Sequence, residues 1–124
     1  MALVLVVDND SIARSQYISG LQQAGHSVTG ASSAQATLDA IDEIKPDIIV
    51  LDIVLSVHNG ITVLYEMMSY ADWSRIPVII LSSVPKADFA NSDEIWKRLN
   101  VISYCHKPTT RPAQLAEIVG ELIK

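Results

Sequence analysis

The sequence predicts one domain of the α/β class, a three-layer α/β/α sandwich around a five-stranded parallel sheet. Five short apolar runs punctuate the 124 residues, and three of them are almost entirely valine, isoleucine and leucine. Such runs are typical of strands that are covered on both faces. Segments with helical spacing of apolar residues separate the runs. Because strand and helix alternate five times, we expect parallel strands joined by right-handed helical crossovers.

Each expected element has its own signal. The strands are the apolar runs at residues 3–7, 26–31, 47–51, 77–81 and 101–105. The four clearest helices carry apolar stripes at one-turn spacing. These stripes are formed by Tyr17 and Leu21; Ala34, Leu38 and Ile41; Ile61, Leu64, Tyr65 and Met68; and Leu115, Ile118, Val119 and Leu122. A weaker helical pattern surrounds Ile95, Trp96 and Leu99.

Punctuating residues set the expected helix ends. Gly25 ends the first helix, and the capping-box pattern Ser32 to Gln35 opens the second. Pro46 closes the second helix. Asn100, which tolerates the left-handed conformation, should end the helix that contains Trp96.

Composition excludes several classes of protein. The chain carries 9 Lys+Arg against 14 Asp+Glu, with no basic run, so we expect no direct contact with nucleic acid. A single cysteine, Cys105, excludes an internal disulfide framework and suits a reducing compartment. No apolar stretch has the length of a membrane span, and the N-terminus lacks a basic segment. We therefore expect one cytoplasmic domain over residues 1–124 that contacts no membrane.

Polar side chains follow four of the five predicted strands. They are Asp8, Asn9 and Asp10 after the first strand, Asp52 after the third, Ser82 at the end of the fourth, and Lys107 after the fifth. In an open parallel sheet, ligands bind outside the carboxyl ends of the strands. Each residue has a plainer alternative, such as a helix cap for Asp8 or Asp10, but their convergence on one sheet end favours a shared site.

The residue types indicate the chemistry of this site. Carboxylates with a carbonyl and water form a hard oxygen site that suits Mg²⁺. A carboxylate beside such a cation can attack phosphorus and become an aspartyl phosphate. An ammonium would offset the charge of the transferring group. The motifs G-x-x-x-x-G-K-[ST], G-x-G-x-x-G and G-x-S-x-G are absent, so NTPase, dinucleotide and serine-hydrolase functions lack their essential parts.

Four sequence segments together resemble the receiver domain of two-component response regulators. They are VLVVDND, PDIIVLDIVLSVHNG, IPVIILSS and YCHKP, and their order and spacing cover essentially the whole chain. The resemblance implies a flavodoxin-like, doubly wound (βα)5 fold with strand order 2-1-3-4-5. It also implies a receiver of a two-component phosphorelay, which catalyses its own Mg²⁺-dependent phosphorylation. The expected phosphodonor is a sensor histidine kinase or a histidine phosphotransfer protein.

The resemblance assigns a role to each matching residue. Asp52 is the expected phosphoacceptor, Lys107 the lysine that contacts the phosphate, and Ser82 the switch hydroxyl, with Tyr104 the aromatic that responds to it. Asp8 and Asn9 match the acidic pair that organises Mg²⁺, and the backbone carbonyl of Val54 is expected to be a further ligand. The Lys107–Pro108 bond is often cis in this family.

Several residues depart from the family pattern. Asn9 replaces the second acid and should weaken Mg²⁺ binding, for which Asp10 is a candidate compensating acid. Ser56 stands where proline is usual, Thr109 replaces an aromatic residue, and extra residues are expected between the fourth strand and the helix that contains Trp96. Val54 and Val84 occupy the positions from which the family usually places the hydrolytic water. Because valine offers that water no hydrogen bond, we expect slow self-dephosphorylation.

The sequence leaves open how the signal is passed on. An output partner is expected on the face of the fourth helix, fifth strand and fifth helix, where Trp96 is either a partner anchor or a half-buried core residue. A homodimer is a further option. The alternative function is that of a degenerate receiver, weakly or not phosphorylated, that acts as a binding or dimerisation module, as Asn9 and the loop changes suggest. Flavin binding is disfavoured because no hydroxyl-rich phosphate loop follows the first strand.

Overall fold

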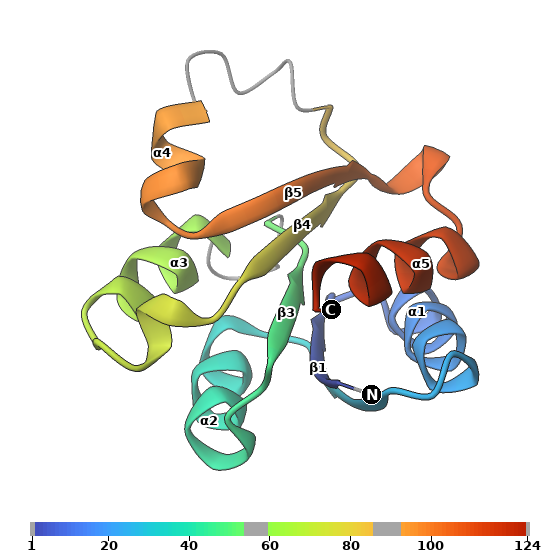
Figure 1. Cartoon of the computed structure of the whole chain (residues 1–124), viewed down its shortest axis with the longest axis horizontal. Helices are drawn as coiled ribbons and strands as arrows, with labels where there is room; N and C mark the ends of the chain where they lie inside the picture. Colours follow the sequence, from blue (N-terminus) through green and yellow to red (C-terminus); the bar gives the residue numbers. More distant parts are fainter. Residues whose placement is uncertain (1, 54–59, 86–92, 124) are drawn as a thin grey trace.

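Five parallel strands form one sheet in the order β2-β1-β3-β4-β5 in the computed structural model (Figure 1). The structure describes residues 2–53, 60–85 and 93–123. The strands are β1 (Leu3–Val7), β2 (Ser27–Ala31), β3 (Ile48–Leu51), β4 (Val78–Ser82) and β5 (Val101–His106). The predicted α/β class and strand order are therefore confirmed, and each strand starts or ends within one residue of its predicted bounds.

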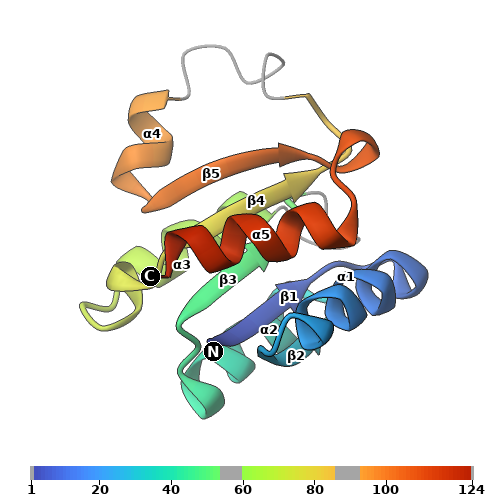
Figure 2. The same ribbon diagram turned by 45° about the vertical axis from the view of Figure 1, so that its right-hand side comes forward.

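Helices cover both faces of the sheet (Figure 2). One face carries α1 (Ser11–Gln23) and α5 (Pro112–Leu122), and the other carries α2 (Ala34–Ile44), α3 (Gly60–Met68) and α4 (Asp93–Arg98). The described residues also form the short 3₁₀ turns η1 (Trp73–Arg75) and η3 (Lys107–Thr109). Within the described ranges, no helix combines the length and apolar content that crossing a membrane requires.

The central strands are buried on both faces because their side chains alternate between two hydrophobic clusters. Leu5 and Val7 of β1 face the cluster under α2, α3 and α4, whereas Val4 and Val6 face the cluster under α1 and α5. This alternation follows from the two-residue period of a strand. It explains why β1, β3 and β4 read as continuous apolar runs.

Local capping matches the sequence analysis in part. Asn100 adopts the left-handed conformation, with φ of 57°, as predicted. The N-cap of α2 is Ser33 rather than Ser32, and its hydroxyl accepts a hydrogen bond from the Ala36 amide. Gln35 does not close a capping box, since its amide donates to Asp39 one turn further along the helix. Two adjacent serines were candidates for the cap, and Ser33 has the extended backbone conformation that an N-cap residue adopts.

The buried face of α3 also differs from the prediction. Leu64 is buried as expected, but Tyr65 is 53% exposed and Met68 lies at the surface. Val63 and Met67 fill the positions that face the sheet. The segment is apolar on more than one side, so spacing alone could not select the face that packs inward.

Trp96 is a core residue, which decides between the two alternatives left open for it, a partner anchor and a core residue. Its side chain is only 5% exposed, and its ring centroid lies 6.1 Å from that of Tyr104 on β5. Leu99, three residues further along, is buried in the same cluster. Residues at this spacing share one side of a helix, and here that side faces the sheet.

Candidate functional site

Asp8, Asp52, Ser82 and Lys107 all lie at the carboxyl end of the sheet. Asp8 directly follows β1 and Asp52 directly follows β3, and these strands pair in parallel register, Val7 opposite Leu51. The Asp52 amide donates to the Val7 carbonyl at 2.9 Å, which continues the pairing to the acid itself. Four residues far apart in the sequence thus reach one sheet edge because the strands are parallel.

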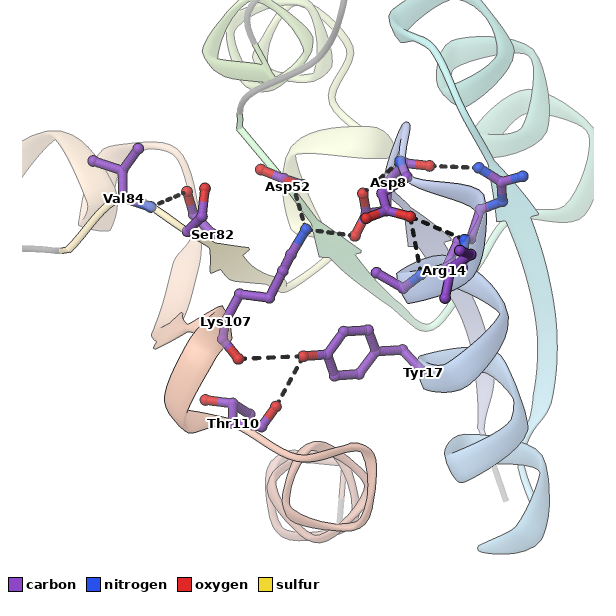
Figure 3. A network of polar contacts seen from close by, with 12 residues as sticks. Asp8, Arg14, Tyr17, Asp52, Ser82, Val84, Lys107 and Thr110 are labelled. Carbon is purple, nitrogen blue, oxygen red and sulfur yellow. Dashed lines mark hydrogen bonds and ion pairs between the residues drawn. The ribbon is translucent and has the colours of Figure 1, made fainter.

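Lys107 joins the two acids. Its Nζ lies 2.7 Å from Oδ2 of Asp8 and 2.7 Å from Oδ2 of Asp52 (Figure 3). The side chains of Asp8 and Asp52 are 3% and 6% exposed, and that of Lys107 is 20% exposed. Burial by itself lowers the pKa of the Lys107 ammonium, but the hydrogen bonds to Asp52 and Asp8 outweigh it, so the pKa is raised. The ammonium therefore stays charged and offsets one of two buried negative charges.

The loop after β1 places its three polar residues differently. Oδ1 of Asp8 accepts a hydrogen bond from the Asp10 amide at 2.9 Å. The Asp10 carboxylate is the N-cap of α1 and accepts from the amides of Ile12 and Ala13 at 3.0 and 3.2 Å. Asn9 is exposed beside the site. The structure thus brings Asp8 to Asp52 and Lys107, and gives Asp10 the capping role.

The donor set of this edge fits a hard cation. Two carboxylates converge there, and the exposed Asn9 side chain next to them carries an amide oxygen. These are the oxygen donors that Mg²⁺ prefers. The residues described by the structure contain no group of three or more His, Cys, Asp or Glu side chains that could hold a metal ion. Val54, whose carbonyl is the expected further ligand, lies outside the described residues, as does Ser56.

Ser82 and Tyr104 both bond to the backbone of one residue, Val84, on the other side of Asp52 (Figure 3). The fully buried Ser82 hydroxyl accepts from the Val84 amide at 3.1 Å. The Tyr104 hydroxyl donates to the Val84 carbonyl at 2.5 Å. Figure 3 shows Ser82 and Val84 on the opposite side of Asp52 from Asp8. The two predicted switch residues are therefore connected through the backbone of Val84. The segment between Val84 and α4, where extra length is expected, lies largely outside the described residues.

Two polar residues that the sequence analysis missed support the ion pair. Nη1 of Arg14 donates to the Asp8 carbonyl at 2.7 Å. The Tyr17 hydroxyl donates to the Thr110 carbonyl at 2.8 Å and lies 3.5 Å from the Lys107 carbonyl. The sequence held one signal for Tyr17: a tyrosine on the buried stripe of a helix needs a partner for its hydroxyl.

The turn after β5 is held by hydroxyl groups. Thr109 and Thr110 donate through their side chains to the His106 carbonyl at 3.1 and 2.9 Å. Thr109, where the family usually has an aromatic residue, thus takes part in the turn that carries Lys107. The Lys107–Pro108 bond is trans, unlike the cis form that is frequent in the family.

Comparisons with known proteins agree on one family. The family model described as the response regulator receiver domain matches residues 4–119. The protein PilH of Pseudomonas aeruginosa is 29% identical over 95% of both chains. A protein-glutamate methylesterase/protein-glutamine glutaminase of Archaeoglobus fulgidus is also 29% identical, but this chain spans only 34% of its length. The crystal structure of the Vibrio cholerae chemotaxis protein CheY4 shares the fold, with a TM-score of 0.85 at 21% identity over 98% of both chains.

Proposed function

This chain belongs to the response regulator receiver domain family, and we propose that it accepts a phosphoryl group on Asp52 from a phosphohistidine donor. The observation that carries the proposal is the Lys107 ammonium held at 2.7 Å from the carboxylates of both Asp52 and Asp8. A buried carboxylate can act as a nucleophile toward phosphorus. A cation at hydrogen-bond distance from it offsets the negative charge of the aspartyl phosphate that forms.

The proposed transfer uses groups that the sheet edge brings together. An oxygen of Asp52 forms a bond to phosphorus while the bond from phosphorus to the donor imidazole nitrogen breaks, and that nitrogen keeps the electron pair. Lys107 lies where its ammonium can contact an oxygen of the transferred group. The Ser82 hydroxyl accepts from the Val84 amide, and a hydroxyl can donate at the same time, here to the phosphoryl group.

Mg²⁺ is part of the proposal. Asp8, Asp52 and the amide oxygen of Asn9 are the described residues that would hold it, with the Val54 carbonyl as the expected addition. A bound Mg²⁺ would supply positive charge to the oxygens of the transferring group. Lys107 contacts the same two carboxylates, so its ammonium and the cation would share their oxygens. Asn9 adds no charge to the site, and we expect weaker binding than an acid there would give.

Partners follow from the family. We propose a sensor histidine kinase or a histidine phosphotransfer protein as donor, and an output partner or a second copy of the chain on the face formed by α4, β5 and α5. Ile102 of β5 and Leu122 of α5 are exposed apolar residues on two of these elements. Trp96 is buried, so the indole is not a surface anchor for that partner.

The test is phosphorylation by a small acyl phosphate donor in Mg²⁺, followed by intact mass. We expect the mass of one phosphoryl group to be added to the wild type and not to Asp52→Asn. We expect no addition when a chelator removes Mg²⁺ before the donor is added. Asp42→Asn is the matched control, because Asp42 is an exposed acid on α2. No mass gain in the wild type, together with no Mg²⁺-dependent beryllofluoride binding, would support the alternative, a degenerate receiver that acts only as a binding module.

A long-lived phosphoryl group is a further part of the proposal. Val84 is half-buried next to Ser82, and its side chain offers no hydrogen bond to a hydrolytic water. Val54, the second residue of this argument, lies outside the described residues. We expect the acyl phosphate of the wild type to outlast that of Val54→Asn when both are measured by loss of the phosphoryl mass. Equal lifetimes would contradict this expectation.

A further inference from the structure

Tyr17 connects α1 to the turn that carries Lys107. Its side chain is 5% exposed and belongs to the buried cluster between the sheet, α1 and α5. The phenolic hydroxyl leaves this cluster to donate to the Thr110 carbonyl at 2.8 Å, and it lies 3.5 Å from the Lys107 carbonyl. Figure 3 shows the hydroxyl meeting both ends of the turn, while the Lys107 side chain extends away toward Asp52 and Asp8.

The turn is short, so its position is set by few contacts. The Thr110 amide donates to the Lys107 carbonyl at 3.2 Å and closes η3. The Thr109 and Thr110 hydroxyls tie the turn to the His106 carbonyl, at the end of β5. Among these hydrogen bonds, those of Tyr17 come from an element far away in the sequence, whereas the others are made within the turn or to the adjoining end of β5. They relate η3 to α1 and therefore to Asp8, which lies just before that helix.

Two links of very different type therefore join the same two segments of the chain. The ion pair spans 99 residues from Asp8 to Lys107, and the Tyr17 hydrogen bond spans 93 residues to Thr110. A lysine side chain is long and flexible, so its ammonium is held at one point only when its backbone is held. The second link holds that backbone.

We propose that Tyr17 is a positioning residue for Lys107: its hydroxyl fixes the turn so that the ammonium lies between Asp8 and Asp52. The effect on phosphorylation rests on the proposed function, whereas the effect on the Lys107 side chain does not. Burial also raises the pKa of the Tyr17 phenol, so the hydroxyl keeps the proton that it donates.

The test compares Tyr17→Phe with the wild type. This change keeps the ring in the cluster and removes only the hydroxyl. Lys107 reactivity toward an amine-acylating ester, measured by peptide mass, should rise about threefold to tenfold because the ammonium is less well held. The exposed residues Lys45 and Lys97 provide the internal reference and should react equally in both proteins.

A matched control removes a different buried hydroxyl. Thr37 is fully buried on α2, and its hydroxyl donates to the Ser33 carbonyl at 2.6 Å. Thr37→Val should cost a similar amount of stability and leave Lys107 reactivity unchanged. Unchanged Lys107 reactivity in Tyr17→Phe, or an equal rise in Thr37→Val, would overturn the proposal.

The phosphorylation rate gives a second measurement. If Tyr17 only stabilised the fold, its effect on this rate would not depend on whether Lys107 is present. Tyr17→Phe should slow phosphorylation of the wild type about threefold to tenfold, and should have no effect when Lys107 is already methionine. A further slowing in the Lys107→Met protein would show that Tyr17 acts elsewhere, and would overturn the proposal. Failure of the wild type to become phosphorylated would count against the proposed function alone, because the reactivity comparison still decides the role of Tyr17.

Discussion

The two sides of the site are held together by different interactions, an ion pair on one side and neutral hydrogen bonds on the other. On one side, the charged groups of Asp8, Asp52 and Lys107 meet at 2.7 Å with their carboxylates almost fully buried. On the other side, Ser82 and Tyr104 form neutral hydrogen bonds to the backbone amide and carbonyl of a single residue, Val84. The charged side joins three segments through side chains, whereas the neutral side depends on the backbone of one loop residue.

This difference indicates which side can move. Removing one partner of a buried ion pair leaves an uncompensated charge and costs about 3–5 kcal/mol. A neutral hydrogen bond contributes only about 0.5–1.5 kcal/mol, because water can replace it. Under the proposed function, a phosphoryl group that contacts Ser82 would rearrange the Val84 backbone and Tyr104, while the charged side stays in place. Tyr104 also packs against Trp96, so such a change would reach α4.

The largest expected effect comes from breaking the charged side. Lys107→Met leaves two buried carboxylates facing each other, so the free energy of unfolding should fall by about 3 kcal/mol near neutral pH. Urea denaturation followed by circular dichroism measures it. Adding Asp52→Asn should recover part of the loss, because one of the two like charges is then removed. A loss below about 1 kcal/mol would show that water already screens these charges.

Alkaline pH should also destabilise the charged side, by less than Lys107→Met does. The pKa of the Lys107 ammonium is raised because the hydrogen bonds and charges of Asp52 and Asp8 outweigh burial, and burial raises the pKa of the Tyr17 phenol. Both groups thus bind protons more tightly in the folded chain. Their stabilisation is complete below the unfolded pKa values, about 10, and is lost as pH rises through the raised folded values.

Urea midpoints of the wild type measured from about pH 8 upward should therefore fall above about pH 10. The fall should be shallower in Tyr17→Phe and in Lys107→Met, each of which lacks one of the two groups. If the urea midpoints of both variants fell as steeply as those of the wild type, the loss of stability at alkaline pH would come from other residues.

The smallest expected effect comes from the neutral side. Tyr104→Phe removes the hydroxyl that donates to Val84 and keeps the ring next to Trp96. We expect a loss of about 1 kcal/mol or less in urea denaturation, since the Val84 loop is partly exposed and water can reach it. A loss as large as that of Lys107→Met would remove the contrast between the two sides.

The positions of Asp8, Asp52, Ser82 and Lys107 could be predicted because they depend on local patterns and one topological rule. Apolar runs identify parallel strands, and the carboxyl ends of parallel strands share an edge. The orientations of Trp96 and Tyr65 could not be predicted in the same way. Each had two plausible environments at the same spacing, and the choice depended on how its helix packed.

The sequence by itself determined the fold class, the order of the elements and the set of residues that reach the carboxyl edge of the sheet. Only the tertiary structure decided that Trp96 is buried and that the Tyr17 hydroxyl reaches a carbonyl 93 residues away. The physical reason is the range of the interactions. Apolar periodicity is local to each segment, whereas the partner of a polar group is chosen by whatever the fold brings within hydrogen-bond distance.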